Sequence, residues 1–448
     1  MADKAAVVIV GAGPAGIFAA LALSEAGVGP VILVEQGRSI ERRRRSRKPD
    51  ILTGWGGAGA FSDGKLTLNP EVGGFLAEIV PAERLKSAMT KADKAWQAFG
   101  AAKEVFAGSP EQIEALATKA KLAGMAFIPS PVRHLGTENC RRLLSQLYAH
   151  LKASCQIMTE TKAAAILAKE DRLFGVELED GRLLEADWVI AAPGRVGSEW
   201  MGQQAEKLGL KWRPNPVDIG VRLEAPAPVL ASLTETFYES KLVYYAPTFE
   251  DKVRTFCMNP SGEVVAEHNG PLVTVNGHSY AKRKTGNTNF ALLVSATFTE
   301  PFDDPIAYGR SIARLANLLG GGVIVQRLGD LLAGRRTTKE RLARCLTQPT
   351  LKEATPGDLS YVLPYRLLKD ILEMIEALDQ LAPGLAGRQT LLYGVEVKFY
   401  SLRLELNQDL ETAIPGLFVI GDGAGVTRGL LQASASGIIA AEAIISRR

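Results

Sequence analysis

The chain has 448 residues, of which 46% are hydrophobic and 23% are charged, a balance that is ordinary for a globular protein. This length exceeds what one hydrophobic core normally serves, so two domains are expected, or three. The net charge of +3 is too small to indicate a nucleic-acid partner by itself.

Cysteine usage and the first residues indicate a compartment. The four cysteines are Cys140, Cys155, Cys257 and Cys345. They are far apart and form neither a zinc spacing nor a disulfide framework, which favours a reducing cytoplasm. The N-terminus has no basic excess, and the apolar segment 5–23 is broken by a glycine turn. We therefore expect neither a signal peptide nor a membrane span.

The first 35 residues contain a strand–turn–helix–strand–acid pattern. Residues 7–10 (Val-Val-Ile-Val) have the composition of a buried parallel strand, and the turn Gly11-Ala12-Gly13-Pro14-Ala15-Gly16 follows at once. Residues 17–23 predict a helix, and residues 31–34 predict a second buried strand that ends at Glu35. An acid about 20 residues beyond such glycines is typical of a dinucleotide-binding fold.

Each part of this pattern has a physical role in binding a dinucleotide. Gly11 permits a tight turn, Gly13 lets a pyrophosphate approach the backbone, and Gly16 lets the helix pack closely on the strand. The helix N-terminus then presents free N–H groups and a positive dipole end to the phosphates. Glu35 can accept hydrogen bonds from the adenosine ribose. An ordinary buried βαβ unit with a glycine-rich turn is the alternative.

A run of arginines follows the acid. Residues 42–45 are all arginine, with Arg47 and Lys48 close behind. A solvated basic loop is the simplest interpretation, although one arginine could touch the adenosine phosphates. Binding of nucleic acid would require more basic surface and interleaved aromatic residues.

Residues 53–66 predict a loop rather than a regular element, because they hold four glycines in six positions and then Ser-Asp-Gly-Lys. The exposed N–H groups of such a loop suit a phosphate or a flat ring. A flexible surface loop is the alternative, but the apolar residues Trp55, Phe61 and Leu66 favour an anchored and functional one.

The middle of the chain changes character twice. Residues 76–124 predict a helical insertion, and residues 137–151 an amphipathic helix. Residues 156–166 predict one strand, and Asp180-Gly181 predicts the turn of a β-hairpin. After the hairpin, residues 188–192 predict an apolar strand that leads into the turn Pro193-Gly194. From residue 213 to about 390, short extended runs predict a mostly antiparallel second domain. Helices are expected around residues 307–319, 337–346 and 364–380.

The C-terminus, like the N-terminus, contains a predicted strand, a glycine-rich turn and a predicted helix. Residues 417–420 predict a buried strand, and Gly421-Asp422-Gly423-Ala424-Gly425 leads to a small-residue helix over 430–445. An acid at a strand end suits ribityl hydroxyls, and a helix N-terminus near Gly429 can stabilise negative charge on the N1/O2 edge of a reduced flavin. A final βα unit that merely packs is the alternative.

These patterns predict an α/β protein: a Rossmann-type FAD-binding domain with a mainly antiparallel α+β second domain. The expected division is an FAD-binding domain over residues 1–212 and 391–448, with a substrate or cap domain over 213–390. Gly320-Gly321-Gly322 precedes a predicted strand, which is the wrong order for a nucleotide turn. The sequence therefore holds no second complete dinucleotide motif.

The chain resembles the FAD-dependent oxidoreductases of the glutathione-reductase-like two-dinucleotide-binding superfamily. More narrowly, it is similar to a family of uncharacterised FAD-dependent, NAD-utilising dehydrogenases. The matching segments are residues 11–16, 56–66, 192–197, 394–401 and 421–430. Residues 257–265 also resemble a family segment, but Asn259 stands where a second cysteine is expected and Ser261 where a glycine is expected. That departure argues against cysteine-pair chemistry.

The resemblance implies non-covalently held FAD. It assigns the pyrophosphate to the first glycine turn, the ribose to Glu35, the isoalloxazine to the loop that ends at Lys65, and the ribityl chain to Asp422. Adenine is expected against the backbone of Ala163 or Ala164. The full set of expected cofactor-binding residues is Gly11, Gly13, Pro14, Ala15, Gly16, Glu35, Gln36, Gly57, Ala58, Gly59, Ser62, Asp63, Lys65, Ala163, Ala164, Pro193, Gly194, Gly421, Asp422, Gly429, Leu430 and Leu431.

The predicted activity is hydride transfer between flavin N5 and a small organic substrate, as a dehydrogenase or a C=C reductase. Candidate proton-handling groups are Cys257, His278, Lys398 and Tyr400, and a structural role is an equal alternative for each. We take Cys257, Lys398 and Tyr400 as the catalytic candidates. Any NAD(P)H is expected to bind transiently, and another electron-donor partner is left open.

Other functions share this fold. A flavin-dependent monooxygenase, a flavin-containing RNA-modifying enzyme and a non-catalytic FAD scaffold are the alternatives. Only the basic run supports RNA, so no nucleic-acid partner and no metal are expected.

Overall fold

The computed structural model describes residues 3–43, 52–61, 64–169, 172–280, 283–296, 298, 304–399 and 402–448. The chain forms two compact units. Unit 1 comprises residues 1–104, 133–215 and 400–448, and unit 2 comprises residues 105–132 and 216–399. Both ends of the chain therefore belong to unit 1, as expected for an FAD-binding domain built from two separated segments.

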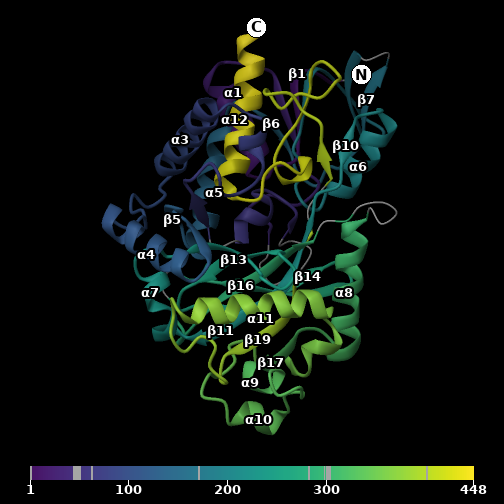
Figure 1. Cartoon of the computed structure of the whole chain (residues 1–448). Helices are drawn as coiled ribbons and strands as arrows, with labels where there is room; N and C mark the ends of the chain where they lie inside the picture. Colours follow the sequence, from purple (N-terminus) through teal and green to yellow (C-terminus); the bar gives the residue numbers. More distant parts are fainter. Residues whose placement is uncertain are drawn as a thin grey trace. The chain divides into compact units, whose positions relative to one another are not determined.

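Unit 1 contains a large sheet, two small ones and several helices (Figure 1). Its elements are β1 (Asp3–Val10), α1 (Pro14–Glu25), β2 (Val31–Val34), η1 (Gly57–Phe61), β3 (Lys65–Thr67), η2 (Leu76–Glu78), α3 (Ala82–Ala98), β5 (Val132–His134), α5 (Thr137–Leu151), β6 (Gln156–Met158), β7 (Ala163–Lys169), β8 (Arg172–Leu178), β9 (Leu183–Ala191), α6 (Ser198–Lys207), β10 (Trp212–Arg213), β20 (Arg403–Leu404), β21 (Leu417–Val419), η5 (Asp422–Ala424) and α12 (Leu430–Ser446).

The large sheet of unit 1 has parallel strands in the order β6-β2-β1-β9, with β21 also paired in parallel to β9. Its strands β1 and β2 are buried and apolar, as strands covered on both faces must be. The carboxyl ends of β1, β2, β9 and β21 lie at one edge of the sheet because these strands are parallel. The order and parallel direction of these strands confirm a Rossmann-type arrangement. In open α/β sheets, ligands bind at this carboxyl edge.

The hairpin expected at Asp180-Gly181 is confirmed, since β8 pairs antiparallel with β9. The single strand expected over residues 156–166 is wrong. Strand β6 ends at Met158 and β7 begins at Ala163, and between them Glu160 has a φ of 55° that a continuous strand does not permit. The first strand pairs with β2 and the second with β8.

Helices α1, α3 and α12 pack against one another beside this sheet (Figure 1). Gly437 on α12 lies directly on the backbone of Ala15 and Ala19, where a Cβ would overlap it. The absence of a side chain at this position lets two helices from opposite ends of the sequence approach closely.

Unit 2 contains an eight-stranded sheet and a separate hairpin. Its elements are α4 (Pro110–Leu122), β4 (Met125–Ile128), β11 (Val217–Pro226), η3 (Ala227–Leu230), α7 (Ala231–Thr234), β12 (Lys241–Tyr245), β13 (Lys252–Asn259), β14 (Glu263–Asn269), β15 (Leu272–His278), β16 (Asn287–Ala296), α8 (Pro305–Gly320), β17 (Ile324–Arg327), α9 (Leu328–Leu331), α10 (Lys339–Ala343), β18 (Thr355–Pro356), η4 (Leu359–Tyr361), α11 (Tyr365–Asp379) and β19 (Leu391–Lys398).

The sheet of unit 2 has the order β18-β17-β19-β11-β16-β13-β12-β4 and is antiparallel except for the β17–β18 pair. Strand β11 alternates apolar residues with Asp218, Arg222 and Glu224, and all of them are buried. The apolar side packs with α8 and α11, and Figure 1 shows α11 lying across the strands. The opposite side of the sheet is therefore polar and also covered.

Two boundaries differ from those expected from the sequence. Helix α3 belongs to unit 1 but α4 belongs to unit 2, where β4 joins the edge of the sheet, so residues 76–124 do not form one insertion. Strand β19 also belongs to unit 2 although it lies beyond residue 390, because it pairs with β11 and β17. In both cases, pairing with strands distant in sequence determines the unit to which a segment belongs, and amino-acid composition does not indicate such pairing.

Unit 2 contains a buried carboxyl whose ionisation destabilises the fold. Asp370 on α11 is fully buried beside Asp251, which pairs with Arg366 at 2.8 Å. Burial, with the neighbouring carboxyl of Asp251, raises the pKa of Asp370 to about 7. An unfolded aspartate titrates near 3.9, so the folded state binds this proton more tightly, and stability is lost as pH rises from about 4 to about 7.

We expect Asp370→Asn to raise the Tm at about pH 8 and to raise it much less at about pH 5, where Asp370 already carries its proton. Differential scanning fluorimetry over this range measures the effect. Glu376→Gln, at an exposed position of the same helix, is the control and should change Tm equally at both pH values. A gain from Asp370→Asn that is independent of pH would contradict the assignment.

Candidate functional site

The first glycine turn joins β1 to α1 and leaves a space beside Gly13. A Cβ built on Gly13 would meet no atom of the described residues within 4 Å, whereas a Cβ on Gly16 would overlap the carbonyl oxygen of Gly11. Gly16 is thus required by the packing of the protein itself, and Gly13 is not. Gly13 is the N-cap of α1, where no described side chain caps the helix and the first turn holds no acid. Such an N-terminus is open to an anion.

Glu35 follows β2 directly and is only 6% exposed. Its Oε2 accepts a hydrogen bond from Ala12 N–H at 2.8 Å. Its Oε1 accepts from Gly37 N–H at 2.8 Å and from Gly54 N–H at 2.9 Å. A carboxylate offers about four acceptor positions, so these three donors leave capacity for a ribose hydroxyl.

The glycine-rich loop is anchored beside the turn. Trp55 is fully buried, and its indole N–H donates to the carbonyl of Leu144 at 2.9 Å. Gly56 N–H donates to the carbonyl of Ala12 at 2.7 Å, and a Cβ on Gly57 would lie 3.3 Å from Gly13 Cα. The loop therefore runs past the open space at Gly13, as expected from its apolar anchors.

Arg43 is a residue whose role the sequence did not reveal. It is 1% exposed, and its Nη1 donates to the carbonyls of Trp55 at 2.6 Å and Gly57 at 2.9 Å. Arg42, by contrast, is exposed and pairs with Glu160. The basic run was expected to be mostly solvated, but this arginine holds the glycine-rich loop in place. Arg44, Arg45, Arg47 and Lys48 lie outside the described residues.

The C-terminal loop reaches the same edge of the sheet. Gly421 lies beside Ala15, and Gly423 lies against Pro193 and Gly194. Helix α12 begins after Gly429, and no described side chain caps it. The N-termini of α1 and α12, neither with a described side-chain cap, thus belong to one region of unit 1. The same region contains the first glycine turn, the glycine-rich loop, the Pro193-Gly194 turn and the C-terminal loop.

Asp422 is the acid of this C-terminal loop. Its Oδ1 accepts from the Thr427 hydroxyl at 2.6 Å. Burial raises the pKa of Asp422 above its ordinary value, against the opposing effects of Arg195, the Thr427 hydrogen bond and Arg428. Asp422 is half-buried, and a carboxylate that has lost part of its hydration is stabilised in its ionised form by further hydrogen-bond donors such as ribityl hydroxyls.

The other expected cofactor residues differ from one another in exposure and in secondary structure. Gln36 is exposed, and Lys65 is half-buried on β3. Ala163 and Ala164 begin β7, and the carbonyl of Ala164 accepts from the indole of Trp200 at 2.9 Å. The remaining members lie in the loops already described: Pro14 in the first turn, Ala58 and Gly59 in η1, and Leu430 and Leu431 in the first turn of α12. Ser62 and Asp63, and the catalytic candidate Tyr400, lie outside the described residues.

Unit 2 brings two of the catalytic candidates together around a buried ion pair. Arg222 and Glu396 are both fully buried and form a bidentate pair at 2.7 and 2.9 Å. Arg222 also donates to the carbonyl of Cys257 at 3.2 Å, and Glu396 pairs with Lys398 Nζ at 2.9 Å. Asn259, at the position where a second cysteine is expected, accepts from Arg222 at 3.0 Å. His278 is the last residue of β15.

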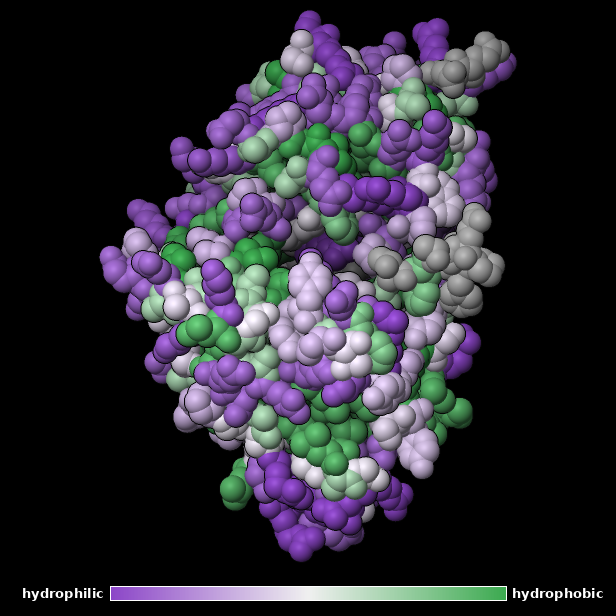
Figure 2. Space-filling model, in the orientation of Figure 1, coloured by the Kyte–Doolittle hydropathy of each residue, from purple (hydrophilic) through white to green (hydrophobic). Residues whose placement is uncertain are grey.

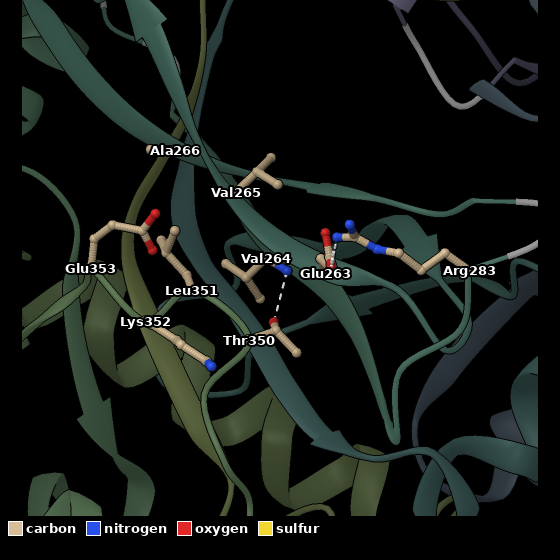
Figure 3. Close-up of a pocket in the computed structure, with 9 residues that line it drawn as sticks. All are labelled: Glu263, Val264, Val265, Ala266, Arg283, Thr350, Leu351, Lys352 and Glu353. Atoms are coloured by element: carbon tan, nitrogen blue, oxygen red, sulfur yellow. Dashed lines mark hydrogen bonds and ion pairs between the residues drawn. The ribbon is translucent and has the colours of Figure 1, made fainter. Parts of the chain in front are cut away.

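Unit 2 also has an open groove of about 620 Å³ beside β14 (Figure 3). Val264 N–H donates to the Thr350 hydroxyl at its floor, and Glu263 and Arg283 form an ion pair beside it. It contains none of the expected cofactor or catalytic residues, so it is not the flavin site. Its lining residues are Glu263, Val264, Val265, Ala266, Arg283, Thr350, Leu351, Lys352 and Glu353.

Two family models match separate parts of the chain. Residues 4–49, which contain the first glycine turn and Glu35, match a family described as "FAD binding domain". Residues 217–399, which form most of unit 2, match "FAD-dependent protein, C-terminal domain-like". The open space at Gly13 and the uncapped N-terminus of α1 fit a pyrophosphate, so the structure is consistent with both matches.

The chain is also similar to an uncharacterized protein from Clostridium beijerinckii, with 28% identity over 483 aligned positions that cover 99% of this chain and 81% of the relative. Among solved structures, L-proline dehydrogenase from P. horikoshii gives a TM-score of 0.43 with 10% identity over 100% of this chain and 95% of that chain. Glycine oxidase from Geobacillus kaustophilus gives 0.41 with 13% identity over 100% and 95%. Similarities at this level do not bear on the chemistry of this chain.

The fold and the two family matches define the chain as a flavoprotein whose cofactor is FAD. Because bound FAD supplies redox chemistry, its class is FAD-dependent oxidoreductase. The narrower NAD-utilising family remains a prediction.

We expect Gly13→Ala to lower FAD affinity at least about tenfold while leaving the apoprotein folded, since the new Cβ meets only the space that a phosphate needs. Gly16→Ala should instead destabilise the apoprotein by about 1–3 kcal/mol, because its Cβ overlaps the Gly11 carbonyl. Titration of apoprotein with FAD and thermal denaturation separate the two effects. Gly286→Ala, at an exposed and open position of unit 2, is the control.

We expect FAD affinity to fall as the pH is lowered from about 8 through the raised pKa of Asp422, because a ribityl hydroxyl that donates to Asp422 favours its ionised form. Asp422→Asn should bind FAD more weakly at about pH 8 and should show a flatter pH dependence. Fluorescence titration at each pH measures both. An unchanged pH profile in this variant would exclude Asp422 as the titrating group.

Proposed function

We propose that this flavoprotein transfers a hydride between flavin N5 and a small organic substrate. The observation that carries the proposal is the open space at Gly13, framed by the uncapped N-terminus of α1 and the buried carboxylate of Glu35. An open position at the N-terminus of the helix, beside such an acid, is the arrangement that a dinucleotide-binding turn requires. Bound FAD supplies hydride transfer, and the protein must present the substrate and move one proton.

Lys398 is the group that we propose for this proton. Its Nζ lies 2.9 Å from Glu396 and 3.7 Å from Glu267, and its side chain is 10% exposed. A lysine in such a carboxylate environment has a fixed position and can exchange a proton with a substrate heteroatom. Cys257 is proposed to act through position only, since its carbonyl accepts from Arg222 and its backbone has a φ of 46°.

The proposed electron donor is NAD(P)H that binds transiently, or another protein. The sequence supports this because it lacks a second complete dinucleotide motif. A reducing cytoplasm is the proposed compartment, in keeping with the four free cysteines.

The purified protein should be yellow and should release FAD on denaturation. Oxidised protein mixed anaerobically with alcohols and amines, and photoreduced protein mixed with carbonyl, imine and activated C=C compounds, should show a rapid change in flavin absorbance with at least one class. Colourless protein that cannot be reconstituted with FAD would exclude the proposal. A fully loaded flavin that exchanges electrons only with oxygen would refute the hydride-transfer part.

Lys398→Met should slow that absorbance change by about 10²-fold or more with an unchanged FAD content, because the proton must then come from solvent. Lys241→Met is a matched control. Both lysines lie over the ring of Phe256, at 5.9 and 5.1 Å, and each pairs with a glutamate. Equal slowing in the two variants would indicate loss of charge on this face rather than loss of a proton carrier.

A further inference from the structure

One end of unit 2 carries a dense cluster of positive charge. We define the basic tip as residues 332–346 together with Arg388. Residues 332–346 contain five cationic side chains and one acidic one, Glu340, in a chain whose total net charge is only +3. Figure 1 places α9 and α10 at this end, and Figure 2 shows hydrophilic residues gathered over them.

Most of these cations face solvent, and Glu340, near Lys339 and Arg344, offsets only part of their charge. Arg336, Lys339, Arg344 and Arg388 are exposed, and none has an ion-pair partner among the residues that the structure describes. Arg335 is the exception, since it pairs with Asp330 at 3.0 Å. The tip therefore presents a net positive field rather than a set of internal salt bridges.

Two leucines are exposed within the same tip. Leu346 is 84% exposed and Leu332 is 57% exposed. Leu346 stands between Cys345 and Thr347, which are both buried, so its side chain is directed outward. Large apolar side chains so exposed beside a charge cluster indicate an interaction surface.

The tip is rigid enough to present these side chains in fixed positions. Asp330 is fully buried and accepts hydrogen bonds from Arg327, Arg335 and Thr337 at 2.8 to 3.0 Å. Although burial opposes ionisation, these bonds hold the pKa of Asp330 at about 2. At the other end, Leu346 N–H donates to Gln389 Oε1 at 3.3 Å. The exposed leucines are thus not the result of a loose loop.

We propose that the basic tip binds peripherally to a membrane surface that carries anionic lipids. Its exposed cations would face the lipid headgroups, while Leu332 and Leu346 would enter the interface. Charge complementarity supports the first part, and the outward leucines support the second. None of the helices in the described part of the chain is long and apolar enough to cross a bilayer, so the attachment is to the surface.

A nucleic acid fits this surface less well. Residues 332–346 contain no aromatic side chain on which a base could stack. A phosphate backbone would use the cations but would leave both leucines in water, whereas a lipid interface uses both kinds of side chain.

The test is co-sedimentation of the full-length holoprotein with vesicles of phosphatidylcholine, with or without phosphatidylglycerol. We expect binding only to the anionic vesicles and a loss of binding at high salt. Each cation removed in Arg336→Gln, Lys339→Gln and Arg344→Gln should weaken partitioning roughly fivefold. Leu346→Ser should weaken it about tenfold or more.

The matched control is the end of α4, where Leu122 is 82% exposed next to the exposed Lys119 and Lys121. Leu122→Ser with Lys119→Gln and Lys121→Gln should leave vesicle binding unchanged. All variants should keep the FAD spectrum, so a failure here is separate from a failure of the proposed redox function.

Three outcomes would overturn the proposal. These are equal binding to neutral vesicles, tighter binding to duplex DNA or RNA that Leu346→Ser does not affect, and self-association in size-exclusion chromatography that Leu346→Ser abolishes. The last two would assign the basic tip to nucleic acid or to a second copy of the chain.

Discussion

The nucleotide cradle of unit 1 depends on one buried carboxylate. Glu35 accepts backbone hydrogen bonds from Ala12 in the first turn, from Gly37 after β2 and from Gly54 in the glycine-rich loop. Hydrogen bonds to an ionised acceptor are among the stronger ones, and a buried charge without them is costly. The acid therefore shapes the cradle before any ribose binds, which explains why it must follow β2 at once.

The opposite end of the chain completes the same cradle. Strand β21 joins β9 in parallel, so Asp422 and α12 emerge at the edge where β1 and β2 end. Helix α12 packs on α1 through Gly437, which has no side chain to hold the helices apart. The first turn thus rests on residues more than 400 positions away, so we expect cofactor binding to depend on the C-terminal helix.

Much of this arrangement could be predicted because it obeys local rules. The strand–turn–helix–strand–acid pattern, the hairpin at Asp180-Gly181 and the helices of unit 2 each have a signature in composition or spacing. The role of Arg43 could not be predicted, because a run of arginines looks solvated until the loop it holds is in place. Nor could the place of β4 and β19, since pairing with β12 and β11, each more than 100 residues away, leaves no local trace.

The buried charges on the polar face of the unit 2 sheet need an explanation beyond the stability of the fold. Arg222 and Glu396 are both fully buried, and such a pair can often be replaced by apolar residues with no loss of stability. The neighbouring positions of β11 already show that apolar residues fit this strand, because Val221 and Leu223 pack with the helices on its other side. A buried ion pair in place of apolar residues is therefore consistent with a role in recognition or chemistry. This is the physical reason for proposing Lys398 on β19, rather than a lysine of the surface, as the proton-handling group.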